Sequence, residues 1–404
     1  TCGHGGYLDF ERLMPTFLFP EKLTAPVTEH LKAAVTHAKI TSEAHVRTPE
    51  NAESIIASGQ ADLVSIVRGQ IADPHLARKT TEGRGDDVRG CISCNQMCWG
   101  RRSRDYWISC LINPSAGREW EWGSEPFAPA QTAKDVLVIG AGPAGLEAAR
   151  VAGERGHRVQ IHEASAHIGG QFRLAGMQPR RGQILDLMGW YERQFEKLGV
   201  ILHLNSYLDG DDLPAADHTI IATGSQPDPS GRQRWNPAHP NLPGMDNGNV
   251  WSPEEVLRRE VKLGDTVVVY DEGGNWRGVG TSWHLAEMGK SVIHVTPDAF
   301  VGKEIARTSA DMPARQRLAR AGARLITEHC ITRWHGNGIT LRSFLTGEEE
   351  TIPASALIMA TTNQAFDPFP ETLSGHTLHR IGDCTAPRTA PYAFHDGWKL
   401  GLML

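Results

Sequence analysis

Residues 135–145 read DVLVIGAGPAG, and this stretch decides the fold. The apolar run at 136–139 has the length and composition of a buried strand, and a G-x-G-x-x-G pattern follows it. In that pattern Gly140 permits a tight turn, Gly142 lets the backbone approach a pyrophosphate, and Gly145 allows a helix to pack closely on the strand. The stretch therefore predicts a dinucleotide-binding β-α-β unit, with the phosphates at the start of a helix over residues 146–153.

The sequence after this helix continues the same pattern. A second strand is predicted over residues 159–162, and Glu163 ends it where a carboxylate can accept hydrogen bonds from ribose hydroxyls. A lone glycine pattern could be only a structural turn, but here strand, helix, second strand and acid stand in register. The segments HIGGQFRLA (167–175) and TIIATGSQP (219–227) add glycines and small residues where a backbone can pass a nucleotide closely.

Upstream, four of the seven cysteines lie within twenty residues, CISCNQMCWGRRSRDYWISC. Their spacing is C-x2-C-x3-C-x11-C, and they are Cys91, Cys94, Cys98 and Cys110. Three bunched thiolates and a fourth from a later turn can surround a [4Fe-4S] cluster. A structural zinc site is an open alternative, although such sites more often show two separated C-x2-C pairs. Two disulfides are a second open alternative. Cys2, Cys330 and Cys384 are scattered and are expected to be small core residues.

Residues 1–85 alternate strand and helix patterns in the order of a parallel α/β unit. Helical spacing covers residues 23–38, a short strand is predicted at 38–41, and ADLVSIV at 61–67 reads as a buried strand. Between these strands Thr48 is expected to cap an amphipathic helix that begins at Pro49 and ends at Ser58.

Arg68 follows the strand at 61–67, directly before a glycine turn. Its guanidinium is suited to phosphate oxygens, and the last two strand-loop units of a (β/α)8 barrel commonly form such a site, although the residue could equally be a surface charge. A full barrel needs about 250 residues. At most the last third of one is therefore expected here, and because Thr1 is not an initiator methionine we expect an N-terminally incomplete fragment.

The rest of the chain predicts a linker at 111–134, a second α/β unit from Thr266, and a tail that returns to the first nucleotide domain. In the second unit, strands are expected at 267–270 and 292–295, and the helix at 281–288. The loop between them, DEGGNWRGVG, departs from the glycine pattern, and Asp271 and Glu272 add negative charge where a phosphate would sit. NAD(P)H binding by this unit is therefore uncertain. The tail is expected to form strands at 356–360 and 379–384, then a helix near 393–402.

Composition excludes several classes of function. The chain has 404 residues, a net charge of −6 and 22% charged residues, which predicts two or three domains and offers no basic footprint for nucleic acid. Its apolar runs have the length of strands, so no membrane span is expected. Since the N-terminus lacks the pattern of a signal peptide, we predict a cytoplasmic protein.

With the cysteine spacing, GAGPAG, GGQF, ATGS and IGDC in this order, the chain resembles the iron-sulfur flavoenzymes of the Old Yellow Enzyme superfamily. This group includes 2,4-dienoyl-CoA reductase, trimethylamine dehydrogenase and N-methylproline demethylase-like NADH:flavin oxidoreductases. The resemblance implies an α/β fold, with the C-terminal part of a (β/α)8 barrel followed by a glutathione-reductase-like pair of Rossmann-type domains. The implied domains are the last third of an FMN-type barrel (1–85), the [4Fe-4S] segment and linker (86–130), an FAD- or ADP-binding domain (131–260, completed by 345–404), and a second Rossmann-like domain (261–344).

The resemblance also implies the site residues. Cys91, Cys94, Cys98 and Cys110 match the cluster ligands, and Ala44, Val67 and Arg68 match the FMN site, with Ala44 where the family usually has a phosphate-binding glycine. The FAD positions are Gly140, Gly142, Pro143, Ala144, Gly145, Glu163, Gly170, Gln171, Ala222, Thr223, Gly224, Gly382 and Asp383. Asp383 could hold a ribityl hydroxyl or cap the following helix. The catalytic residues of the early barrel strands are absent, and His4 and Tyr7 are the only candidates.

The activity implied by the resemblance is an electron relay from FMN through the cluster to the second flavin or an external electron carrier. The altered loop at Asp271 resembles the amine-oxidising branch, so oxidative N-demethylation or dehydrogenation of a small methylated amine is favoured. NAD(P)H-dependent reduction of a 2,4-dienoyl-CoA or enoate is the alternative. A third possibility is an electron-transfer subunit or remnant without a complete FMN barrel. A homo-oligomer with a small-molecule substrate is expected.

Overall fold

The computed structural model describes residues 10–210 and 213–404, which divide into two compact units. Unit 1 takes in the described parts of residues 1–173 and 183–224 together with residues 367–404, and unit 2 takes in residues 174–182 and 225–366. Helix α9 (Gly170–Gly176) lies where the chain passes from the first unit to the second. Each unit is described by itself.

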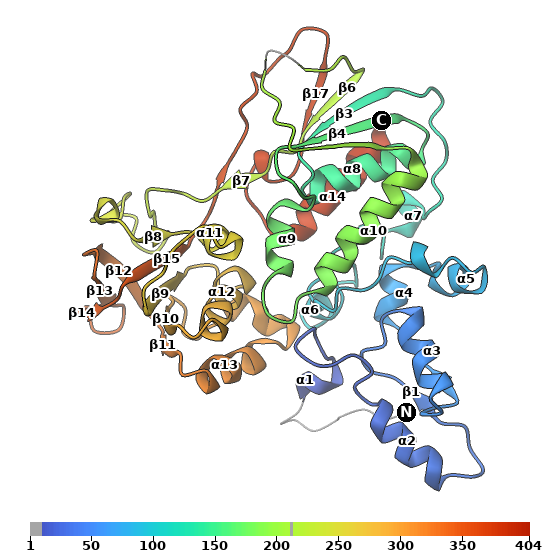
Figure 1. Cartoon of the computed structure of the whole chain (residues 1–404), viewed down its shortest axis with the longest axis horizontal. Coiled ribbons are helices and arrows are strands. Elements are labelled where there is room, and N and C mark those ends of the chain that lie inside the picture. Colours follow the sequence, from blue (N-terminus) through green and yellow to red (C-terminus); the bar gives the residue numbers. More distant parts are fainter. Residues whose placement is uncertain (1–9, 211–212) are drawn as a thin grey trace. The chain divides into compact units, whose positions relative to one another are not determined.

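Unit 1 is built on a parallel sheet in the order β17-β6-β3-β4-β5 (Figure 1). Its strands are β3 (Asp135–Ile139), β4 (Arg158–Glu163), β5 (Ile201–Leu204), β6 (His218–Ile221) and β17 (Thr377–Arg380). Helices α8 (Pro143–Glu154), α10 (Gln183–Leu198) and α14 (Ala390–Met403) belong to this unit, and α8 contacts the other two. The predicted β-α-β unit is confirmed, although α8 begins at Pro143 because Gly142 is its N-cap and proline suits the first helical position.

The tail returns to this sheet because small residues let two helices approach closely. A Cβ atom on Gly397 of α14 would lie 2.2 Å from the carbonyl oxygen of Ala144, and one on Gly401 would lie 2.6 Å from Cβ of Val151. Residues 144–153 of α8 are all buried, so this helix is surrounded by its neighbours. The tail thus returns to unit 1 through β17 and α14, as predicted. The strand expected at 379–384, however, spans Thr377–Arg380, and Gly382–Cys384 form a 3-10 turn.

The N-terminal part of unit 1 alternates short strands and helices. Thr41 and Ser42 of β1 pair in parallel with Leu63 and Val64 of β2. The elements are α1 (Phe10–Leu13), α2 (Ala25–Ala34), β1 (Thr41–Ser42), α3 (Pro49–Ala57), β2 (Leu63–Val64), α4 (Arg68–Ala72), α5 (Leu76–Thr81), α6 (Trp99–Arg102) and α7 (Glu119–Trp122), with a 3-10 turn at Gly85–Asp87. The expected cap of α3 is confirmed, because the Thr48 side chain accepts a hydrogen bond from the Asn51 N–H.

Two predictions for this region need correction. The strand expected at 61–67 spans only Leu63–Val64, and Arg68 begins α4 rather than ending a strand. The reason is local, because Val67 already has helical dihedral angles, φ −100° and ψ −63°. A strand of two residues cannot be told from a longer one by its apolar composition.

Unit 2 contains a second parallel sheet, in the order β11-β10-β9-β15-β8. Its strands are β8 (Val250–Trp251), β9 (Thr266–Asp271), β10 (Ser291–Val295), β11 (Arg324–Ile326) and β15 (Ala356–Ala360). An antiparallel sheet is formed by β12 (His329–Trp334), β13 (Gly338–Ser343) and β14 (Glu349–Pro353), and β7 (Ser225–Gln226) pairs with β16 (Gln364–Ala365). The helices are α11 (Pro253–Arg258), α12 (Trp276–Glu287) and α13 (Asp311–Arg320).

Strand β9 is buried on both faces, as its continuous apolar sequence predicts. Val267 and Val269 share a hydrophobic cluster with Leu285 of α12, whereas Val268 and Tyr270 pack with Trp334 of the antiparallel sheet. The central strand therefore joins helices on one side to β12–β14 on the other.

The boundary between the nucleotide-binding domains differs from the prediction. Strand β15, assigned to the first domain, pairs with β9 and β8, so residues 225–260 and 345–366 lie in unit 2. An apolar strand carries no periodicity that identifies its sheet. The predicted loop at 271–280 is also too long, because the Asn275 side chain accepts the Arg277 N–H and caps α12 five residues earlier than expected.

Among the described residues, no helix has the length and apolar character that a membrane crossing requires.

Candidate functional site

The glycine loop after β3 has the geometry that a bound pyrophosphate needs. Gly140 has a φ of 102°, and a Cβ atom there would lie 2.5 Å from the Ala222 carbonyl oxygen. A Cβ atom on Gly145 would lie 2.0 Å from the Gly140 carbonyl oxygen, so α8 can pack on the loop only with glycine at this position. Thus Gly140 and Gly145 are required by the fold itself.

Gly142 is different, because a Cβ atom there would meet nothing within 4 Å. Gly142 is also the N-cap of α8, and no side chain caps the helix at this point. The first N–H groups of a helix attract anions through their unsatisfied hydrogen bonds and the helix dipole. The space beside Gly142 therefore fits a phosphate group.

The other predicted FAD residues gather around this loop. The Gly169 N–H donates to the Ala141 carbonyl oxygen at 2.7 Å, and a Cβ atom on Gly170 would lie 3.5 Å from Gly142 Cα. Ala222 hydrogen-bonds Ile139, so Thr223 and Gly224 follow at the carboxyl end of the sheet. Pro143 and Ala144 open α8, Gln171 lies in α9, and Gly382, with φ 71°, packs on Ala144.

Two predicted acids make contacts that the sequence does not specify. The Glu163 carboxylate accepts the N–H groups of Ala141 and Ser165, both at 2.8 Å, and so holds the glycine loop. A carboxylate has about four acceptor positions, which leaves room for a ribose hydroxyl. Asp383 accepts the Arg388 N–H at 3.1 Å, and α14 begins only at Ala390, so Asp383 orders the turn before the helix rather than capping its first residue.

Gly142→Ala is expected to separate ligand binding from folding. The residue has a φ of −75°, which alanine adopts freely, and its added methyl group meets no protein atom. We expect unchanged unfolding of the apoprotein but FAD affinity weaker by about 1–3 kcal/mol, or roughly 5- to 150-fold, because the methyl group overlaps the ligand. Fluorescence titration with FAD measures this effect. Equal FAD affinity in both proteins would show that the pyrophosphate does not lie here.

The four clustered cysteines line the same cavity. Arg68, Asn95 and apolar side chains complete its wall, and all four cysteines are free thiols. No three His, Cys, Asp or Glu side chains within residues 10–210 and 213–404 are placed so that they could hold a metal ion. A single zinc would need sulfurs about 2.3 Å from one point, whereas each cysteine of a cubane binds a different iron. A [4Fe-4S] cluster at these four thiols stays a prediction.

Backbone N–H groups are directed at each of these sulfurs. The Ser93 N–H lies 3.3 Å from the Cys91 sulfur. The backbone of Gln96 is hydrogen-bonded to Cys94, and that of Trp99 to Cys98. Cys110 is hydrogen-bonded by the backbone of Ile112 and Asn113. Burial, followed by the nearby Cys91 and Cys98 sulfurs, raises the pKa of the Cys110 thiol to about 12, and burial also raises the pKa of Cys94 and Cys98. Hydrogen-bond donors aimed at four buried sulfurs suit thiolates that a metal cluster neutralises.

The predicted FMN residues lie beyond the ends of β1 and β2. Ala44 has a φ of 67°, a conformation that favours glycine, and Val67 is 65% exposed. Arg68, however, donates to the Asn95 side-chain oxygen at 2.5 Å and lines the cysteine cavity. His4 and Tyr7, the weak catalytic candidates, lie outside the described residues, as does Cys2. Cys330 and Cys384 are buried, as predicted.

A buried charge network was missed by sequence reasoning. The Arg150 guanidinium contacts Glu125 at 2.9 Å, Glu147 at 2.8 Å and Glu154 at 2.8 Å, and Arg89 contacts Glu125 at 2.9 Å. Both guanidinium groups lie over the rings of Trp190 and Trp398. Residues 111–134 were expected to be a surface linker, but Glu125 joins this network and Phe127 is buried. The glutamate and arginine at i and i+3 within the apolar residues of LEAARVAG were the available signal.

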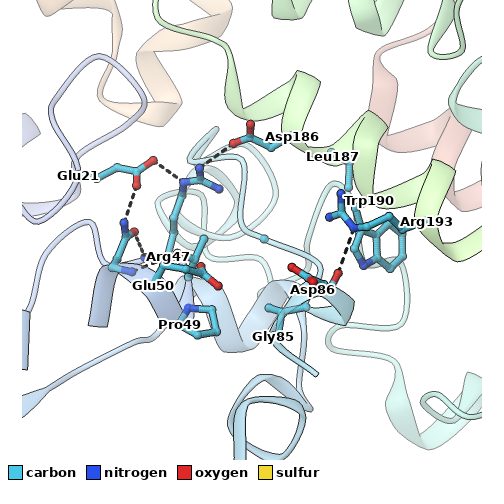
Figure 2. A pocket seen from close by; sticks show the side chains of 14 residues that line it. Glu21, Arg47, Pro49, Glu50, Gly85, Asp86, Asp186, Leu187, Trp190 and Arg193 are labelled. Atoms are coloured by element: carbon cyan, nitrogen blue, oxygen red, sulfur yellow. Dashed lines mark hydrogen bonds and ion pairs between the residues drawn. The ribbon is translucent and has the colours of Figure 1, made fainter. Parts of the chain in front are cut away.

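An open cavity of about 280 Å³, also not predicted, lies between α3, the 3-10 turn at Gly85–Asp87 and α10 (Figure 2). Arg47 is bonded to Glu21 at 2.5 Å and to Asp186 at 2.8 Å, while Arg193 lies at the opposite side beside Asp86 (Figure 2). Arg47 therefore links α10 to the N-terminal segment through Asp186 and Glu21, whereas Arg193 donates to the Asp86 backbone carbonyl oxygen.

In unit 2, the Asp271 carboxylate occupies the loop that follows β9. Asp271 accepts the N–H groups of Gly273 and Gly274 at 3.1 and 3.0 Å, and a Cβ atom on Gly278 would lie 2.2 Å from the Asp271 carboxyl carbon. Asn275 caps α12 in addition. The groups that would bind a phosphate in this unit are therefore already paired within the protein.

The chain was compared with known proteins. A family model described as pyridine nucleotide-disulphide oxidoreductase matches residues 134–367. A probable N-methylproline demethylase of Rhizobium meliloti is 36% identical over 63% of this chain and 36% of its own length. The N,N-dimethylglycine/sarcosine dehydrogenase of Chromohalobacter salexigens is 30% identical over 96% of this chain and 60% of its own length.

Among solved structures, a 2-naphthoyl-CoA reductase in complex with 2-naphthoyl-CoA matches with a TM-score of 0.88 and 31% identity. The match covers 96% of this chain and 57% of the reductase. The chain therefore spans between about a third and three fifths of the length of these proteins.

Proposed function

Because the chain belongs to the pyridine nucleotide-disulphide oxidoreductase family, we propose that it takes part in the oxidation of a small methylated amine. The proposed reaction is oxidative N-demethylation or dehydrogenation. Homologues of the FMN, iron-sulfur and FAD enzyme group cover most of the chain. The homologues are oxidoreductases of the flavoprotein group that includes amine demethylases and enoate-type reductases. Within this group, the proposal selects the branch that oxidises amines.

One observation carries this choice of branch. Asp271 places its carboxylate over the loop N–H groups that would otherwise face a dinucleotide phosphate. The Asp271 carboxyl is either neutral or negative, and burial raises its pKa to about 7, so this side chain offers no positive charge to a phosphate. An enzyme that takes its electrons from a methylated amine has no need of NAD(P)H, whereas a reductase of enoates does.

Residues in unit 1 would hold the redox groups. Cys91, Cys94, Cys98 and Cys110 suit a [4Fe-4S] cluster, the loop at Gly142 suits the pyrophosphate of FAD, and the ends of β1 and β2 suit the phosphate of FMN. When bound, flavins supply hydride transfer and the cluster supplies single-electron transfer. The chain contributes placement, by packing the cysteine segment on α8 and α10 through Arg89 and Arg150.

The alternative function is an NAD(P)H-dependent reductase of an enoyl-CoA or related enoate. The match to 2-naphthoyl-CoA reductase over 96% of the chain favours it. A relay subunit without its own FMN is a third candidate, because FMN would be enclosed only by a complete barrel.

Anaerobic reduction of the FAD-loaded chain distinguishes these functions. We expect NADH and NADPH to leave the flavin oxidised, since the loop of unit 2 has no free phosphate site. Rapid bleaching by either nucleotide would contradict the amine branch. In parallel, bleaching by sarcosine or N,N-dimethylglycine in the presence of FMN, with release of formaldehyde, would support it. FAD and iron without retained FMN in the purified chain would support the relay subunit.

A further inference from the structure

Two loops that are predicted to face a flavin phosphate also contact the cysteine loop. Ala44 and His45 follow β1, and Arg68 follows β2. His45 is hydrogen-bonded to the Ser93 hydroxyl at 2.8 Å, and Arg68 donates to Asn95 at 2.5 Å. Ser93 lies between Cys91 and Cys94, and Asn95 lies between Cys94 and Cys98.

The residues at these contacts are buried and conformationally restricted. Ser93 and Asn95 are at most 1% exposed, and their φ angles are 53° and 55°. Left-handed conformations in residues other than glycine cost free energy and persist only where surrounding contacts hold them. Asn95 is held at a second point, because its amide donates to the Met14 carbonyl oxygen at 2.7 Å. The cysteine loop thus depends on side chains from outside itself.

Arg68 also brings its charge to the sulfurs. Its side chain lines the cavity together with Cys91, Cys94, Cys98 and Cys110, so the guanidinium lies beside the sulfurs. Within a buried site, a fixed positive charge stabilises any added electron far more than it would in water. Hydrogen bonds and charges around the sulfurs are among the factors that set the potential of an iron-sulfur cluster.

We propose that Arg68 is a positioning residue of the cysteine site, which holds Asn95 in place and raises the reduction potential of the bound cluster. This inference rests on the proposed cluster and deepens it. It gives the Arg68 guanidinium a role at the cysteines in addition to any contact with a flavin phosphate. The reaction concerned is the reversible addition of one electron to the cluster, supplied in the test by dithionite.

The test is a reductive titration of the anaerobically reconstituted chain, followed by EPR, for the wild type, Arg68→Gln and Arg68→Lys. We expect Arg68→Gln to lower the ratio of reduced to oxidised cluster at a fixed potential at least tenfold, which is about 59 mV for a one-electron couple. Arg68→Lys keeps the charge and is expected to stay within threefold of the wild type. Arg102→Gln is the matched control, because its side chain is 65% exposed four residues after Cys98.

Equal potentials for Arg68→Gln and Arg102→Gln would overturn the inference while leaving the cluster in place. Absence of any cluster in the wild type would overturn both the inference and the proposed function. Should Arg68→Gln take up no iron, Asn95→Gly serves instead. Glycine tolerates the left-handed backbone, and the variant removes both the partner of Arg68 and the hydrogen bond to Met14. A lowered potential in Asn95→Gly supports the proposal, and an unchanged one overturns it.

Discussion

Replacing Arg150 with methionine is expected to lower the free energy of unfolding by about 3–5 kcal/mol, because it leaves buried carboxylates without their cation. Arg150 is 2% exposed and contacts Glu125, Glu147 and Glu154. Burial opposes ionisation of Glu125, yet Arg150 and Arg89 hold its pKa at about 2. Glu147 is fully buried and also accepts the Tyr191 hydroxyl at 2.5 Å. Urea unfolding at neutral pH measures the loss.

The matched control is Arg158→Met in the same domain. Arg158 pairs with Asp135 at 2.6 Å, but both side chains are more than half exposed, and exposed ion pairs contribute little to stability. We expect a much smaller loss in this variant. Similar losses for Arg150→Met and Arg158→Met would contradict the view that the buried network fastens the cysteine segment to α8 and α10.

The second large effect concerns pH and the Asp271 loop. Burial raises the pKa of Asp271 from 3.8 to about 7, with Asp298 raising it further and the two loop N–H groups and Arg277 opposing the rise. Between about pH 4 and 7 the folded protein therefore keeps a proton that the unfolded chain releases. The stability that this proton contributes is present at acid pH and is lost as the pH rises through 7.

Asp271→Asn removes this dependence, because asparagine keeps the acceptor for Gly273 and Gly274 without a charge. Between pH 4 and 8, we expect the free energy of unfolding of the variant to rise relative to that of the wild type by roughly 4 kcal/mol at most. This value corresponds to about three pKa units at 1.36 kcal/mol each. Comparing the variant with the wild type cancels the opposite contribution of His294, which lies 3.6 Å away and whose pKa burial lowers to about 3.

Unfolding of unit 2 followed by tryptophan fluorescence at several pH values provides the measurement. Asp265→Asn is the control, because this carboxylate lies just before β9 and is fully exposed. Its difference from the wild type should not change with pH. A difference for Asp271→Asn that is equally independent of pH would show that Asp271 is ionised in the folded protein at acid pH.

Local features of the fold could be predicted from sequence. The turn at Gly140, the helix after Gly142 and the strand ending at Glu163 follow from short-range rules about backbone space and hydrogen bonding. The cap at Thr48 also depends on neighbouring residues. The proximity of four cysteines could be expected because they lie within twenty residues of one another.

Long-range choices were beyond the sequence. Nothing in ALIMA at 356–360 says which of two parallel sheets it joins, because an apolar strand fits the centre of either. The contact of Arg68 with Asn95 could not be predicted, because the direction of a long side chain depends on partners that come from another segment. A flavin phosphate at Arg68 stays a prediction. The pairing of Arg89 with Glu125 and of Arg150 with Glu147 likewise required the tertiary structure.

Iron and sulfide analysis of the anaerobically reconstituted chain tests the central claim most directly. If Cys91, Cys94, Cys98 and Cys110 hold a [4Fe-4S] cluster, the chain should bind about four iron and four sulfide ions and show the broad visible absorption of a cluster, and Cys110→Ser should lose most of it. One zinc ion per chain, without sulfide and without visible absorption, would contradict the account.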